Sequence, residues 1–202
     1  MRTAPTRADR RSETRAQLIA VAERRFTADG YHATSLDAVA DEAGFTKGAV
    51  YSNFSSKEDL FFAVYERRVE RSVAAAGHVP AATDVDAAVR EQVAAAAARR
   101  DRDDGWLAVF LEFWTHVVRH PEHRARFAAA HTRAIEPFQR AVELFAAQQG
   151  VTLAIAPDQL AVAMFAMENG IGLERLTDPE IVDADLPVRL LELIFGALGR
   201  ED

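Results

Sequence analysis

The 202-residue sequence contains no cysteine. This absence excludes disulfide bonds, thiolate nucleophiles and cysteine-ligated zinc. No stretch of 18 consecutive apolar residues occurs, so we expect no helix that spans a membrane. Residues 1–15 contain arginine but no apolar segment follows them, which argues against a signal peptide. We therefore expect a cytoplasmic protein.

The chain is also poor in lysine, because Lys47 and Lys57 are its only two, beside 22 arginines. The net charge of −7 argues against non-specific binding of nucleic acid by the whole surface. Residues 1–57 nevertheless carry nine basic and seven acidic side chains, whereas residues 58–202 carry 15 basic and 24 acidic. Both lysines and the positive excess lie near the N-terminus, so an anionic partner is expected there.

Almost the whole chain has the periodicity of amphipathic helices. Apolar residues recur three and four positions apart, and no convincing alternating run predicts a strand. We therefore predict an all-α fold of about nine helices. Capping residues, glycines and prolines place them near residues 12–30, 36–43, 46–54, 57–76, 84–100, 104–120, 121–149, 157–176 and 186–198. Ser55 to Glu58 is interpreted as a capping box that opens the fourth helix.

Two of the predicted helices, 36–43 and 46–54, are short and are joined by Gly-Phe-Thr. A short turn with glycine between two such helices is typical of a helix-turn-helix, whose second helix lies in the major groove of DNA. Gly48 would let that helix approach the groove closely. Val50 and Phe54 are expected to face the core of the domain.

Several polar residues could meet phosphates or base edges in this arrangement. Within the second helix they are Thr46, Lys47, Tyr51 and Ser52. A lysine ammonium serves as a point charge for phosphate, which gives Lys47 and Lys57 a reason to lie at helix starts. Further candidates for phosphate or minor-groove contacts precede or open the first predicted helix, namely Arg10, Arg11 and Arg15.

The segment GYHATSLDAVADEAGFTKGAVYSNFSSKEDLFFAV, residues 30–64, resembles the DNA-binding segment of the TetR family of bacterial transcriptional regulators. The shared features are the glycine-aromatic pair, the Thr-Ser helix start, the Ala-Gly turn, the Gly-x-x-Tyr-x-x-Phe helix and the Lys-Glu-x-Leu that follows. Ser52 stands where the family often has histidine. The resemblance implies a DNA-binding domain in residues 1–56 and an effector-binding and dimerisation domain in residues 57–202. It implies DNA contacts from Thr34, Ser35, Thr46, Lys47, Gly48, Tyr51, Ser52 and Lys57.

The resemblance also implies a small-molecule pocket in the C-terminal domain, whose occupancy weakens DNA binding. The expected function is a repressor that releases double-stranded operator DNA when an unidentified effector binds. A transcriptional activator or dual regulator of the same fold is the alternative. Candidate pocket residues are Phe110, Trp114, His116, Phe138, Met164, Phe165, Met167 and Glu168, with Asn169 and Arg133 as further polar anchors.

A hypothesis from another class is a helical metal-dependent enzyme. Glu112, His116 and His120 lie four residues apart on one predicted helix, with His123 nearby, and such groups bind zinc or iron. No separate general base stands out, and no phosphate loop, nucleophile elbow or HExxH motif occurs. We therefore expect a protein without enzymatic activity, resident metal or cofactor.

The last two long helices carry apolar residues at helical spacing. These residues are Leu160, Met164, Met167, Ile171, Leu186, Leu190, Ile194 and Leu198. The helix predicted for residues 186–198 is apolar on most sides, so it requires cover on more than one side. We therefore predict a homodimer in which these two helices meet the same pair from a second subunit.

Overall fold

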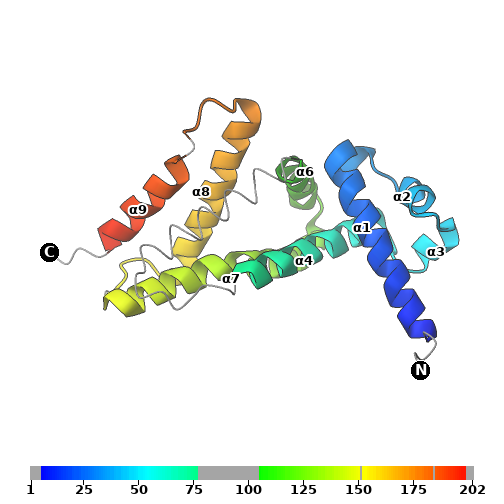
Figure 1. The fold of residues 1–202 in the computed structure, drawn as a ribbon, viewed down its shortest axis with the longest axis horizontal. Coiled ribbons are helices and arrows are strands. Elements are labelled where there is room, and N and C mark those ends of the chain that lie inside the picture. Colours follow the sequence, from blue (N-terminus) through cyan, green and yellow to red (C-terminus); the bar gives the residue numbers. More distant parts are fainter. Residues whose placement is uncertain (1–5, 77–104, 151, 184, 199–202) are drawn as a thin grey trace, which may run out of the picture. The chain divides into compact units, whose positions relative to one another are not determined.

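The computed structural model describes residues 6–76, 105–150, 152–183 and 185–198. Within these ranges the chain forms eight α-helices, one 3-10 helix and no strand, which confirms the all-α prediction (Figure 1). The helices are α1 (Arg7–Ala33), α2 (Leu36–Ala43), α3 (Lys47–Tyr51), α4 (Lys57–Ala76), α6 (Trp106–Arg119), η1 (Pro121–His123), α7 (Arg124–Gln149), α8 (Pro157–Thr177) and α9 (Leu186–Leu198). The helix predicted for residues 84–100 lies outside the described ranges.

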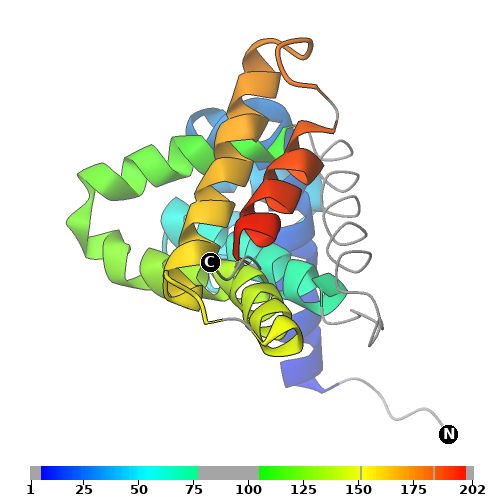
Figure 2. The same cartoon turned by 90° about the vertical axis from the view of Figure 1, so that its left-hand side faces the viewer.

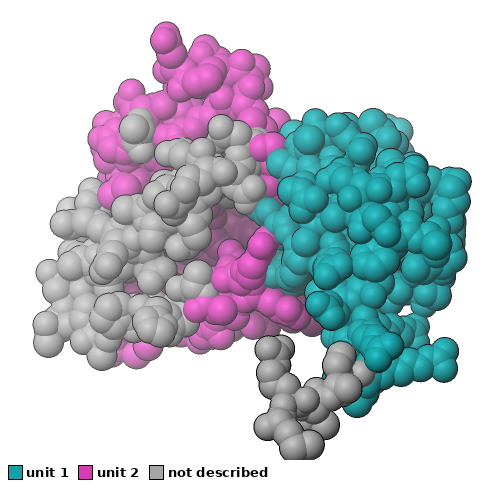
Figure 3. Space-filling view, turned by 45° about the vertical axis from the view of Figure 1, so that its right-hand side comes forward, with its two compact units in different colours: residues 1–68, 108–127 teal, residues 69–107, 128–202 magenta. Residues whose placement is uncertain are grey.

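The chain divides into two compact units (Figure 3). Unit 1 consists of residues 1–68 and 108–127, and unit 2 consists of residues 69–107 and 128–202. Helices α4, α6 and α7 each contribute residues to both units. None of the helices that the structure describes is both long and apolar enough to cross a membrane.

The core of unit 1 is built from aromatic side chains of α1, α4 and α6. Phe26, Tyr31, Phe61 and Phe113 are all buried. The rings of Phe61 and Phe113 stack with their centroids 3.9 Å apart, and Tyr31 meets both edge-on. Burial of such large apolar side chains is the main favourable term in folding. This cluster therefore fixes α1, α4 and α6 against one another.

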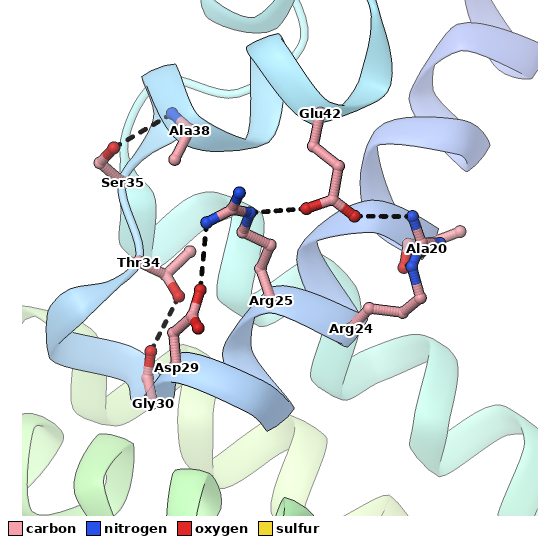
Figure 4. A network of polar contacts seen from close by, with 9 residues as sticks. All are labelled: Ala20, Arg24, Arg25, Asp29, Gly30, Thr34, Ser35, Ala38 and Glu42. Atoms are coloured by element: carbon pink, nitrogen blue, oxygen red, sulfur yellow. Dashed lines mark hydrogen bonds and ion pairs between the residues drawn. The ribbon is translucent and has the colours of Figure 1, made fainter.

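Charged side chains hold α2 against α1 (Figure 4). The carboxylate of Glu42 accepts hydrogen bonds from Arg24 at 2.9 Å and Arg25 at 2.6 Å, and Arg25 also donates to Asp29 at 3.1 Å. The hydrogen bonds from Arg25 and then Arg24 lower the pKa of the Glu42 carboxyl. The α2 helix is thus fixed by polar contacts as well as by its buried Leu36, Val39 and Ala40.

The start of α4 differs from the predicted capping box. The Ser56 hydroxyl, rather than that of Ser55, accepts the backbone N–H of Asp59 at 3.2 Å. The Asp59 carboxylate in turn accepts the N–H of Ser55 at 3.0 Å. Glu58 was predicted to close the box, but its carboxylate accepts the hydroxyl of Tyr31 at 3.0 Å. The capping serine is one residue later than predicted. Two consecutive serines, each with an acidic residue three positions on, allow either serine to cap the helix.

Near its C-terminus α1 is interrupted at Gly30, which has φ +85° and ψ 166°. Only glycine adopts this backbone conformation readily. A Cβ placed on Gly30 would also lie 2.9 Å from Oε1 of Glu112. Gly30 therefore has two reasons to lack a side chain, a strained backbone and a close neighbour.

We expect Gly30→Ala to lower the free energy of unfolding by about 1–3 kcal/mol for the backbone strain alone. Gly44→Ala is the matched control, because Gly44 has φ 71° and ψ 25°, and no atom lies within 4 Å of an added Cβ. Thermal unfolding of both variants measures the difference. A melting temperature for Gly30→Ala equal to or above that of Gly44→Ala would contradict the assignment.

The core of unit 2 lies between α7, α8 and α9, and Figure 2 shows α8 and α9 side by side. Its buried members are Val142, Phe145, Leu160, Met164 and Leu191, with Phe138, Leu153, Met167 and Ile194 packed against them. The α7 helix contains Pro137 and continues through it as one helix.

Several apolar residues of α8 and α9 that the sequence assigned to a dimer surface lie in or against the core of unit 2. Leu160 and Met164 are buried within the core of their own subunit, and Ile194 packs against it. Among the side chains of these two helices whose burial is described, the large apolar ones that are exposed are Val162, Leu173, Leu176 and Leu193. Helical spacing alone does not say which of two apolar faces is covered within the chain, so the dimer contacts of these residues stay a prediction.

Candidate nucleic-acid interface

The predicted helix-turn-helix is present in the structure, and local capping groups define it. The Ser35 hydroxyl accepts the N–H of Ala38 at 3.1 Å and starts α2, which ends at Gly44 in a left-handed conformation. The Thr46 hydroxyl accepts the N–H of Ala49 at 3.2 Å and starts α3. Serine and threonine stabilise helix starts in this way, and glycine is favoured at helix ends. The two short helices are therefore separated by residues 44–46 alone.

One face of α3 is buried and the other is open to solvent. Val50 and Phe54 are buried, which confirms their predicted place in the core. Tyr51 is 56% exposed and the side chain of Lys47 is 64% exposed. The remaining candidate contacts of this segment, Thr46, Gly48 and Ser52, are also exposed. The α3 helix thus presents hydroxyls, an ammonium and a residue without a side chain on one accessible surface.

Gly48 has no structural reason to be glycine. Its φ is not positive, and an added Cβ would meet only the Thr46 hydroxyl oxygen, at 3.9 Å. Glycine within a helix is less stable than alanine by about 0.5–1 kcal/mol. A glycine kept where a side chain would fit and stabilise the helix indicates close approach by another molecule.

Lys47 forms an ion pair with Asp37, the Nζ lying 2.5 Å from Oδ2. The hydrogen bond to Asp37 raises the pKa of Lys47, so its ammonium stays charged. Asp37 lies in the first turn of α2, ten residues earlier in the chain. An anionic ligand at α3 would therefore compete with the Asp37 carboxylate for this ammonium.

The two candidate DNA contacts at the start of α2, Thr34 and Ser35, have different surroundings. Thr34 is 2% exposed, and its hydroxyl donates to the carbonyl oxygen of Gly30 at 2.8 Å. Ser35 is exposed. The burial of Thr34 does not support its predicted phosphate contact, whereas the contact predicted for the exposed Ser35 stays a prediction.

Lys57 is only partly exposed. Its ammonium donates to the carbonyl oxygens of Tyr31 at 3.0 Å and His32 at 3.2 Å, and it lies 4.5 Å from the Tyr31 ring centroid. Burial lowers the pKa of Lys57, against the attraction of Glu58 and Glu112. Lys57 therefore stabilises the end of α1 in the absence of DNA, and its phosphate contact stays a prediction.

Two arginines of α1 contact the segment around α3. Arg11 donates to the carbonyl oxygen of Ser52 at 3.0 Å, and the Arg15 guanidinium lies 5.0 Å from the centroid of the Phe54 ring. These contacts fix the end of α3 to the N-terminal half of α1. The sequence indicated these arginines only as possible phosphate ligands.

The candidate effector residues fall in both units. Phe110, Trp114 and His116 belong to unit 1, where Phe110 is buried and packs on Trp114 with ring centroids 5.1 Å apart. Phe127 completes this aromatic group, at 5.4 Å from Trp114.

The other candidates lie in unit 2. Met164 is a core residue, and Phe138 and Met167 pack against the same core. The Phe165 ring lies 5.0 Å from His131 and 5.8 Å from Phe138. Burial lowers the pKa of His131, which favours its neutral form. Glu168 and Asn169 are half-buried on the same helix as Phe165.

The metal donors that the sequence grouped together do not form one site in the structure. The Glu112 carboxylate accepts the backbone N–H of His32 at 3.2 Å. In the described parts of the chain, the group of donors close enough for one metal ion is Glu58, His116 and His123, whose ligand atoms lie within 4.8 Å of one another. Sequence reasoning missed Glu58, because it lies far from both histidines in the chain.

Comparison with known families gives two adjoining matches. The profile described as "Bacterial regulatory proteins, tetR family" matches residues 18–64. The profile described as "BetI-type transcriptional repressor, C-terminal" matches residues 66–195, which is more than half of the chain.

Individual curated relatives are similar in sequence to a segment of this chain. The transcriptional activator FasR of Mycolicibacterium smegmatis is 44% identical over 63 residues, which cover 31% of this chain and 29% of FasR. The regulator AcrR of Shigella flexneri is 44% identical over 54 residues, covering 27% of this chain and 25% of AcrR. The matches therefore span less than a third of these curated relatives.

Solved structures resemble nearly the whole fold. One is a transcriptional regulator from Saccharomonospora viridis in complex with choline, with 23% identity, a TM-score of 0.69, and coverage of 92% of this chain and 96% of that one. Another is the fatty acid degradation regulator FadR of Bacillus halodurans, with 15% identity, a TM-score of 0.71 and 96% coverage of both chains. At these identities the likeness shows the fold.

Proposed function

This chain belongs to the TetR family of bacterial transcriptional regulators, and we propose that it is a homodimeric repressor whose DNA binding is weakened by a small molecule. Residues 1–56 are proposed to bind the operator, and residues 57–202 to bind the effector and the second subunit. The proposal assigns the chain no catalytic activity and places it in the cytoplasm, with chromosomal DNA.

The exposed face of α3 is the observation that carries this proposal. Lys47 and Tyr51 are exposed beside Gly48, where a side chain would fit the fold without strain. The recognition helix of a helix-turn-helix lies in the major groove, with its N-terminal residues at base edges. A residue without a side chain at that position allows the backbone to approach the bases.

We expect Asp37→Asn to tighten operator binding about two- to five-fold, as is typical of a single exposed ion pair. The substitution removes the carboxylate that holds Lys47, so the ammonium is available to a phosphate. Asp29→Asn is the matched control, because it makes the same charge change at a carboxylate paired with Arg25. Fluorescence anisotropy with a labelled operator measures both. Equal tightening in the two variants would show that the change in net charge causes the effect, and would contradict a role for the release of Lys47.

A quaternary ammonium compound is the first effector class to test, because one relative of this fold was solved with choline. Aromatic rings bind such cations through their faces. Both units offer aromatic candidates, namely Trp114 and Phe110 in unit 1, and Phe165 and Phe138 in unit 2. The effector site stays a proposal, and these residues are the ones to vary first.

The test is a titration of choline and larger quaternary ammonium compounds into the complex of the protein with operator DNA. Coupling between two such sites typically changes affinity about 5- to 150-fold, and the operator must weaken ligand binding by the same factor. The proposal is supported if the ligand weakens DNA binding and the DNA weakens ligand binding by the same factor. Ligand binding that leaves the DNA affinity unchanged would contradict ligand control by that compound class.

Activation of transcription is the second candidate function, because the relative FasR is named as an activator. The two functions differ in where the protein binds relative to the promoter. A footprint that overlaps the promoter, with higher reporter expression after deletion of the gene, supports repression. A footprint upstream of the promoter, with lower expression after deletion, supports activation.

A homodimer through α8 and α9 is part of the proposal. Leu193 is 69% exposed on α9, and Leu173 and Leu176 are 45% and 44% exposed on α8. Exposed apolar side chains on adjacent helices favour burial against a partner. A second copy presenting the same surface would bury them in an isologous interface.

A further inference from the structure

Three potential metal donors of unit 1 converge from separate elements. Glu58 lies in the first turn of α4, His116 in the last turn of α6 and His123 in η1. One ligand atom from each lies within 4.8 Å of the other two. His116 Nε2 is 3.5 Å from Glu58 Oε1. In a tetrahedral zinc site with bonds of about 2.0–2.1 Å, two ligand atoms lie about 3.4 Å apart, which is close to this distance.

The His116 ring is held in position by aromatic neighbours. Its centroid lies 5.4 Å from Tyr31, 5.9 Å from Phe113 and 4.1 Å from His120. Its Nε2 is buried and makes no hydrogen bond with any described residue. Buried polar atoms normally have a partner, and an ion between this nitrogen and the Glu58 carboxylate, 3.5 Å away, would supply one.

We propose that Glu58, His116 and His123 form a binding site for Zn²⁺ or a similar divalent transition-metal ion. Two imidazole nitrogens and one carboxylate oxygen are a ligand set that zinc uses, and the fourth tetrahedral position is left for water. Metal binding requires side-chain rotations that bring the donor atoms, now up to 4.8 Å apart, to within about 3.4 Å of one another. The Tyr31 hydroxyl, 3.0 Å from Glu58, orients the carboxylate from outside the site, as outer partners of metal ligands do.

This inference goes beyond the proposed function and does not depend on it. A bound ion would cross-link the start of α4 to the end of α6 and to η1, all within unit 1. Because the unfolded chain has no such arrangement, metal binding stabilises the folded state. The site is therefore testable by affinity and by thermal stability, without operator or effector.

The first test uses full-length protein without a histidine tag, treated with a chelator and then titrated with zinc sulfate in competition with a chromophoric indicator. We expect one zinc ion per chain with a dissociation constant in the micromolar range or tighter, and a higher melting temperature with zinc. Cobalt(II) should give the visible absorption bands of a four-coordinate site. The absence of stoichiometric binding by the wild-type protein would overturn the proposal.

The second test uses variants. Glu58→Gln and His123→Gln should each weaken zinc binding tenfold or more and abolish the thermal shift. His120→Gln is the matched control, because His120 stacks on His116 but pairs with Glu122 and is not one of the converging donors. His116→Gln is not decisive, since that ring also packs in the core. Unchanged affinity in Glu58→Gln and His123→Gln, or equal loss in His120→Gln, would contradict the donor set.

Discussion

Gly48→Gln is expected to abolish specific operator binding while the protein stays folded. No atom other than the Thr46 hydroxyl oxygen lies within 4 Å of an added Cβ, so the subunit accommodates the new side chain. Glycine is among the poorest helix formers, so the substitution should leave the melting temperature unchanged or raise it. The side chain would instead occupy the space between α3 and the bases. Affinity should fall to the non-specific level, about 10³-fold or more below the wild type.

Anisotropy with operator DNA and thermal unfolding are both needed to interpret this variant. Gly48→Ala should give a smaller loss of affinity, since one methyl group projects less far. Ala125→Gln, on the exposed first turn of α7, is the control for a new glutamine elsewhere and should bind normally. Wild-type affinity in Gly48→Gln would show that α3 does not approach DNA through this face. A lowered melting temperature would show that the fold requires glycine there.

Leu173→Glu combined with Leu193→Glu is expected to convert the dimer to monomers and to weaken operator binding about 10²- to 10⁴-fold. Both leucines are largely exposed in the single chain, so the substitutions should not disturb the subunit core. In the proposed dimer the carboxylates would be buried without partners, which is costly. Loss of the second subunit removes the gain that two linked DNA-binding modules provide.

Light scattering should give a mass near twice 22.2 kDa for the wild type and near 22.2 kDa for the double variant. The control is Leu144→Glu with Ile155→Glu, two exposed apolar residues that lie outside α8 and α9. It should remain dimeric. A wild-type protein that scatters as a monomer would contradict the proposed assembly, as would a double variant that stays dimeric.

Local signals allowed the helix-turn-helix to be predicted from the sequence. The bounds of α2 agree with the prediction, because Ser35 and Gly44 act through their own backbone and that of their neighbours. Thr46 likewise caps α3. The burial of Val50 and Phe54 follows from their spacing opposite the exposed residues. Such features depend on a few adjacent residues, which are visible in the chain.

The missed features all depend on contacts between distant residues. Thr34 and Ser35 are chemically alike, and only the packing at the end of α1 shows that the first is buried. Lys57 lies beside Tyr31 and His32 because α1 and α4 pack together. The same packing brings Glu58 to His116, a pairing that no spacing in the sequence indicates. Met164 lies in the core between α7, α8 and α9, which its spacing in the sequence does not reveal, and its place in an effector pocket stays a prediction.

Selection of DNA from a random duplex library by the purified wild-type protein tests the central claim most directly. A symmetric dimer that reads DNA through α3 should enrich a two-fold symmetric sequence, with half-site centres about 10 base pairs apart or a multiple of this spacing. Gly48→Gln, selected in parallel, should not enrich it. No enrichment by the wild type, or equal enrichment by Gly48→Gln, would contradict DNA reading by the exposed face of α3.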